Sequence, residues 1–72
     1  MHSDKQTAEL IRKNLVNAIR SSGLTQTEIA ARAGLGTSAI SNYIHRGKLP
    51  TLCTFVVLCE VLDVSSEDIL EI

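Results

Sequence analysis

The 72-residue chain has no tryptophan, a single tyrosine, a single phenylalanine, one proline and two cysteines. Because only two side chains are aromatic, the core has to be aliphatic, and an apolar content of 44% can supply one small domain. Cys53 and Cys59 are six residues apart on one predicted helix, so they lie about 240° apart around its axis and cannot form a disulfide with each other. No CxxC or Cys/His cluster indicates a metal or another cofactor. We therefore expect reduced thiols.

Long apolar runs and catalytic constellations are lacking as well. No segment approaches the ~20 apolar residues of a membrane span, and the first ten residues lack the apolar stretch of a signal peptide. His2 and His45 have no evident catalytic partners, and no glycine-rich phosphate loop is present. We expect one domain spanning residues 1–72, cytoplasmic and not an enzyme, either free-standing or cut from a larger protein.

Charge is divided unevenly along the chain. Residues 1–48 carry seven basic and three acidic side chains, a net charge of +4, whereas residues 49–72 carry five acidic and no basic ones, a net charge of −5. A basic surface attracts phosphates, so the first part is expected to face nucleic acid and the acidic part to point away from it. The alternative is an ordinary solvated surface.

The segment 25–50, TQTEIAARAGLGTSAISNYIHRGKLP, carries the most specific pattern. Thr25 followed by Glu28 is a capping-box sequence that begins a helix. Gly34 supplies the left-handed residue that ends this helix, and Leu35 in the turn is expected to point into the core.

A second helix is expected to start at residue 36 or 37 and to be polar on one face. Its inward residues are Ile40 and either Tyr43 or Ile44, and its outward residues are Thr37, Ser38, Ser41 and Asn42. A helix, a tight turn and a second helix with a polar face are how many proteins place side chains in the major groove of DNA.

Three more helices are expected around this motif. They cover about residues 4–22, residues 51–62 with Thr51 as the N-cap, and a last helix capped by Ser65 with Asp68 three residues on. Inward positions are Ile11, Leu15, Ala18 and Ile19 in the first of them and Leu52, Phe55, Leu58, Cys59 and Leu62 in the second.

The helix over residues 51–62 is apolar on its opposite side too, at Cys53, Val57 and Val61. A helix that is apolar all round is either buried or covered by a partner. We therefore predict a homodimer whose interface contains Val57, Val61, Leu70 and Ile72. Scattered surface valines are the alternative.

The motif has a characteristic spacing of residues: Gln26 at the start of the capped helix, the small Ala30, Gly34 four residues later and Ile40 six residues after that. This pattern resembles the Cro and phage-repressor (XRE) family of helix-turn-helix proteins. The resemblance extends from about Leu10 to Leu70. It implies an all-α, five-helix, lambda-repressor-like domain with its motif at about residues 25–45. It also implies a sequence-specific transcriptional regulator, a repressor that binds an inverted-repeat operator in double-stranded DNA as a dimer.

The resemblance also assigns roles to residues. Thr37, Ser38 and Asn42 stand where family members contact base edges, with Ser41 adjacent, and Gln26 stands where they contact the phosphate backbone. His45, Arg46 and Lys48 cluster just beyond the second helix of the motif, and we assign them to phosphates. Serine, threonine and asparagine can hydrogen-bond to bases, but the absence of arginine among them predicts weak recognition of guanine. Arg20 and Arg32 are further candidates for phosphate contacts.

Two departures from the family pattern stand out. Many members pair an arginine late in the first helix with a glutamate after the recognition helix, and these places hold Ile19 and Ile44 here. Apolar side chains can replace a buried ion pair at little cost, so we predict that Ile19 and Ile44 touch. The glycine after the recognition helix also comes one residue later than in many relatives, at Gly47.

Two other functions use the same fold. One is an antitoxin that binds both an operator and a toxin, and the other is a protein-interaction module without DNA activity. The acidic, apolar C-terminal part would suit a protein partner.

Overall fold

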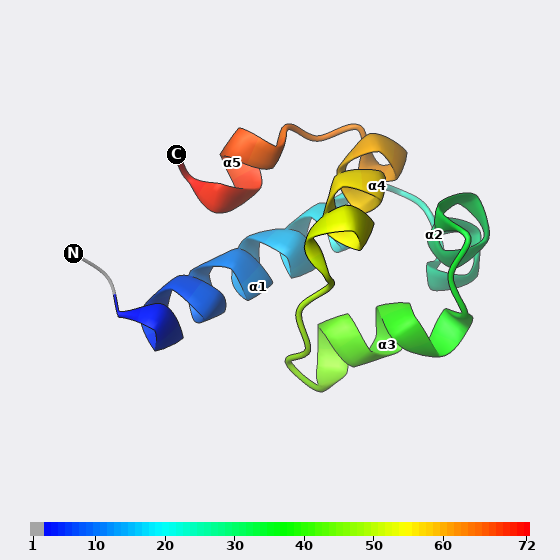
Figure 1. The fold of residues 1–72 in the computed structure, drawn as a ribbon. Helices are drawn as coiled ribbons and strands as arrows, with labels where there is room; N and C mark the ends of the chain where they lie inside the picture. The colour runs from blue at the N-terminus through cyan, green and yellow to red at the C-terminus, as the bar shows by residue number, and fades with distance from the viewer. Residues whose placement is uncertain (1–2) are drawn as a thin grey trace.

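The computed structural model describes residues 3–72, which form five helices and no strand (Figure 1). The helices are α1 (Asp4–Ser21), α2 (Gln26–Ala33), α3 (Thr37–His45), α4 (Leu52–Leu62) and α5 (Ser66–Leu70). The predicted all-α, five-helix architecture is confirmed. The prediction for His2 lies outside the described residues.

Local hydrogen bonds set the helix ends much as the sequence predicts. At the start of α2, Thr25 Oγ1 accepts from the Glu28 N–H at 3.1 Å and Glu28 Oε1 accepts from the Thr25 N–H at 3.1 Å. At its end, Gly34 has a φ of +71°, and the Leu35 N–H donates to the Ala30 carbonyl at 2.8 Å. This left-handed residue ends α2 and changes the direction of the chain before α3 begins.

Ser65 is the N-cap of the last helix, as predicted, but Asp68 does not complete a capping box. The Ser65 hydroxyl accepts from the Glu67 N–H at 3.2 Å, two residues on, and Asp68 takes no part in a capping box. An aspartate side chain is one methylene shorter than the glutamate or glutamine that normally reaches back to the N-cap.

One aliphatic core joins all five helices. Its fully buried side chains are Leu15, Ile29, Ile40 and Leu58. The placement of Leu52 in this core was wrong, because its side chain is 77% exposed. Leu52 is the first residue of α4 and lies at the helix end that projects beyond the core. Of the two alternatives in α3, Ile44 is buried and Tyr43 is half-buried.

The helix–helix contacts separate the motif helices α2 and α3 from α5, which packs on α1. Helices α2 and α3 pack together at one end of the molecule, and α4 packs on α2 (Figure 1). Helix α5 lies along α1, where Asn14 Nδ2 donates to the Ile69 carbonyl at 2.9 Å and to Glu71 Oε2 at 2.7 Å. The outer side of α3 is therefore left free for a ligand, well away from α5.

Candidate nucleic-acid interface

Helix α3 is anchored by its apolar side and presents its polar side outward. Ile40 and Ile44 are buried, and Thr37 and Ser38 in the first turn are exposed. Ser41 and Asn42 were expected outside but are half-buried, so only part of each side chain is accessible. The first turn of α3 therefore offers the freest polar groups.

The start of α2 and the end of α3 meet at an open pocket of about 330 Å³. Its walls are Ile19, Arg20, Leu24, Thr25, Gln26, Ile44 and His45. The pocket thus brings together two of the residues predicted to bind phosphate, Gln26 and His45, and adds Arg20. Ile19 and Ile44 are both buried and line the same pocket, as expected of neighbours across α1 and α3.

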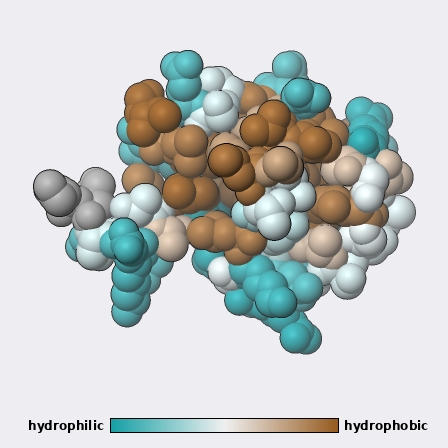
Figure 2. Space-filling model, viewed as in Figure 1, coloured by the Kyte–Doolittle hydropathy of each residue, from teal (hydrophilic) through white to brown (hydrophobic). Residues whose placement is uncertain are grey.

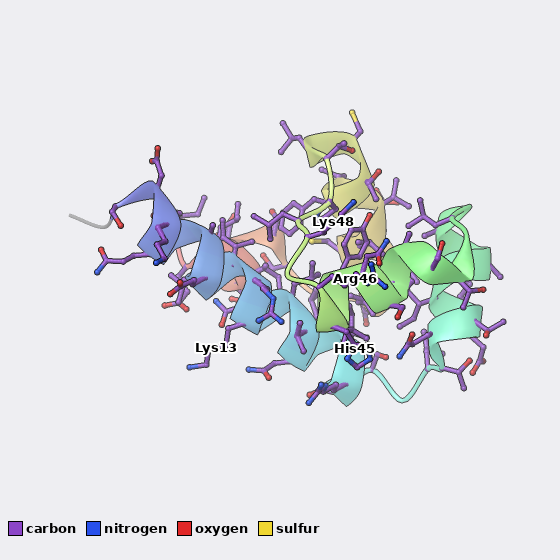
Figure 3. The ribbon with its side chains drawn as sticks, turned by 90° about the horizontal axis from the view of Figure 1, so that it is seen from below. Lys13, His45, Arg46 and Lys48 are labelled. Carbon is purple, nitrogen blue, oxygen red and sulfur yellow. The ribbon has the colours of Figure 1, made fainter. Side chains whose placement is uncertain are left out.

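Charge gathers at the C-terminal end of α3. His45, Arg46 and Lys48 are all exposed, and Figure 3 shows them along α3 and the loop that follows it, with Lys13 extending into solvent from the neighbouring α1. Gly47, with a φ of +69°, turns the chain between Arg46 and Lys48. The three side chains His45, Arg46 and Lys48 are called the basic cluster below, and Lys13 is a separate exposed base on α1.

Two titratable side chains, Glu28 in α2 and Cys59 in α4, have pKa values that the fold shifts. Hydrogen bonds from the Thr25 backbone and side chain, with Arg32 nearby, hold the pKa of Glu28 below its ordinary value, so the carboxylate stays ionised in the capping box. Burial raises the pKa of the Cys59 thiol, which keeps it protonated and unreactive. Among residues 3–72, no His, Cys, Asp and Glu side chains gather where they could hold a metal ion.

Two residues of the site were not predicted from the sequence. Lys13 is an exposed base on α1, the helix beside the end of α3, and it precedes the motif in the sequence (Figure 3). Arg12 donates from Nη2 to the Ile44 carbonyl at 3.0 Å, across 32 residues. The position of Arg12 on α1 could have been predicted. It lies seven residues, about two helical turns, before Ile19 and therefore on the same side of the helix.

Comparison with known proteins agrees with this geometry. A family model described as helix-turn-helix matches residues 17–69, which include α2 to α4 and most of α5. No curated protein and no solved structure matched the chain. No helix within residues 3–72 is long and apolar enough to cross a membrane. From the family match and the five-helix fold, the chain belongs to the Cro and phage-repressor (XRE) family of helix-turn-helix DNA-binding regulators.

Proposed function

We propose that this protein is a sequence-specific transcriptional repressor that binds an inverted-repeat operator as a homodimer, with α3 in the major groove of each half-site. The observation that carries the proposal is the pairing of an exposed polar turn, at Thr37 and Ser38, with the basic cluster at the other end of the same helix. Such a protein works in the cytoplasm, beside its DNA.

The residues divide by role. Thr37 and Ser38 would contact base edges directly, while Ser41 and Asn42 would reach them with the exposed part of their side chains. Gln26, His45, Arg46 and Lys48, with Lys13, would bind phosphates and fix the register of the helix without recognising sequence. Because the groove-facing side chains are short and uncharged, ordered water and DNA shape would contribute to specificity.

The surface for the second copy would be the outer side of α4. Leu52, Val56 and Val57 are 77%, 48% and 38% exposed, and Leu49 just before α4 is 40% exposed. Figure 2 shows hydrophobic residues gathered over this side of the molecule. Of the residues predicted for the interface, Val57 and Ile72 are exposed, whereas Val61 and Leu70 are half-buried and would lie at its edges.

A second copy fits this surface better than another ligand would. Leu49 directly follows Lys48, so two copies joined here would each carry a basic cluster close to the shared interface. Half-sites about 34 Å apart, one helical turn of DNA, are the spacing that such a dimer requires. The acidic residues of α4 and α5 are unsuited to phosphates, which favours a protein on this side.

DNA recognition is tested by selecting binding sites from a random duplex library with the purified chain. Enrichment of an inverted repeat is the expected result. Ser38→Ala should then change preference at one base pair, whereas Arg46→Ala should weaken all sequences alike and lower the slope of log K against log salt by about 0.9. If no sequence is enriched even at low salt, the proposal is wrong.

Dimerisation is tested by sedimentation at tens of micromolar protein. Leu52→Glu/Val56→Glu should give a monomer that stays folded by circular dichroism, because both side chains are largely exposed in the single chain. Asn17→Glu/Ala31→Glu adds the same charge at exposed positions of α1 and α2 that are outside the proposed interface, and should remain dimeric. A monomeric wild-type protein would contradict the homodimer.

The second candidate is an antitoxin or a protein-interaction module. The exposed apolar side of α4 supports it, because a different protein could cover that side. A wild-type chain that is monomeric and shows no salt-dependent affinity for duplex DNA would favour the interaction module. A monomeric chain that still enriches a DNA site would favour the antitoxin.

A further inference from the structure

Arg12 links the first helix to the end of the recognition helix. Its Nη2 donates to the Ile44 carbonyl at 3.0 Å in a partly buried contact. Ile44 is in the last turn of α3, where carbonyl groups have no partner within the helix. A guanidinium at this end also opposes the negative pole of the helix dipole. The contact therefore satisfies a carbonyl and stabilises the C-terminal turn of α3.

The loop after α3 is shaped around the same side chain. A Cβ built on Gly47 would lie 3.3 Å from Arg12 Nε and 3.7 Å from Arg12 Cδ, and Gly47 also has a φ of +69°. Arg12 Nε is itself buried and has no hydrogen-bond partner. The side chain is thus enclosed between α1 and residues 46–48, and the bond to Ile44 is its one polar contact to α3.

This contact stands where the usual link between α1 and the recognition helix is missing. The positions that hold an ion pair in many relatives are the buried Ile19 and Ile44 here. Arg12 lies two turns earlier on the same side of α1 and bonds to the backbone of residue 44 instead of its side chain. The polar link between the two helices has therefore moved from a side-chain pair to a single arginine and a carbonyl.

We propose that Arg12 is a positioning residue for DNA recognition, which holds the end of α3 and the loop 46–48 so that His45, Arg46 and Lys48 face the DNA. It acts through these residues and does not bind DNA itself. The inference rests on the proposed function. Without Arg12 the basic side chains can still meet phosphates, so the salt slope is kept, but they no longer hold α3 in one register, and affinity for the operator falls more than affinity for unrelated DNA.

The test compares Arg12→Met with Lys13→Met, which removes the same charge from the exposed neighbouring position. Each variant is titrated with the selected operator and with an unrelated duplex across a salt series, at a temperature where it is folded. Arg12→Met should lose about tenfold or more in operator affinity with an unchanged salt slope. Lys13→Met should weaken both duplexes alike and lower the slope by about 0.9, because the proposed role of Lys13 is a phosphate contact.

Two outcomes would overturn the inference. If Arg12→Met weakens both duplexes equally and lowers the salt slope, Arg12 is a phosphate contact. If it binds the operator like wild type and only melts earlier, its role is structural. Two further variants apply if Arg12→Met fails to fold. Arg12→Lys keeps a hydrogen-bond donor and should retain part of the operator affinity, whereas Gly47→Ala should lower the operator affinity by displacing the Arg12 side chain. Wild-type operator affinity in both Arg12→Lys and Gly47→Ala would count against the inference.

A measurement on the free protein separates this inference from the proposed function. Amide hydrogen exchange at residues 45–48 should become at least several-fold faster in Arg12→Met than in Lys13→Met. Unchanged exchange would contradict the positioning role whatever the DNA data show. If the wild-type chain shows no sequence preference but amide exchange is faster in Arg12→Met, the proposed repressor function is wrong. The role of Arg12 in holding the end of α3 then still stands.

Discussion

Helices α3 and α4 use the same core in the same way and expose opposite chemistry. The nine residues of α3 bury Ile40 and Ile44, and the eleven of α4 bury Phe55, Leu58, Cys59 and Leu62. The outer side of α3 begins with hydroxyl groups and ends in the basic cluster, whereas the outer side of α4 is mainly apolar, at Leu52, Val56 and Val57, with one exposed charge at Glu60. Inward residues explain folding in both helices, and the contrast between the outer sides is the one that the proposed DNA and dimer surfaces would require.

Charge follows the same division. The seven basic residues all precede residue 49, and every residue after it that carries charge is acidic. Phosphates would be attracted to the end of α3 and repelled from α4 and α5. A protein with one side for DNA and another for a second chain needs this separation, because a mixed surface would bind both poorly.

The largest expected effect tests the contrast between buried and exposed positions within α4. Leu58→Ala should lower the free energy of unfolding by about 2–5 kcal/mol, since its side chain is completely buried. Leu52→Ala, with the same chemistry at a 77% exposed position, should cost about 0.5 kcal/mol or less in the monomer. Ile40→Ala in α3 should resemble Leu58→Ala. Urea unfolding at low protein concentration measures all three, and similar losses at positions 52 and 58 would contradict the burial assigned here.

Leu52 also shows where sequence information ends. The capping box at Thr25, the left-handed turn at Gly34 and the inward position of Ile40 were predicted because each depends on residues within one or two turns. Leu52 has the right helical spacing for the core, but spacing cannot tell that the buried part of α4 begins only at Phe55. The sequence places Arg12 on the same side of α1 as Ile19, but it does not reveal the partner of Arg12, a backbone carbonyl 32 residues away. Long-range packing determines both.

A smaller effect compares the ends of α2 and α4. Both helices end in a left-handed residue, Gly34 at a φ of +71° and Asp63 at a φ of +55°. Gly34→Ala should destabilise the protein by about 1–2 kcal/mol through backbone strain, because no atom lies within 4 Å of the added Cβ. Asp63→Gly should stabilise it by roughly 0.5 kcal/mol, the relief of strain being partly offset by the entropy of glycine in the unfolded chain. Thermal unfolding measures both, and a destabilised Asp63→Gly would show that the aspartate side chain stabilises this turn.

The smallest effect concerns Glu28, the one acidic side chain in the basic motif. Hydrogen bonds with Thr25 lower its pKa in the folded protein, so the ionised carboxylate is favoured by folding. Its contribution is therefore present above the ordinary pKa of a glutamate, which applies to the unfolded chain, and is lost as the pH falls through the lower folded-state pKa. Glu28→Gln keeps an acceptor for the capping box but cannot ionise. Between pH 6 and pH 3 the unfolding free energy of wild type should fall further than that of Glu28→Gln, since all other carboxyl groups are common to both. Parallel pH profiles would mean that the capping hydrogen bond is equally strong with a neutral side chain, and the start of α2 would then owe nothing to its charge.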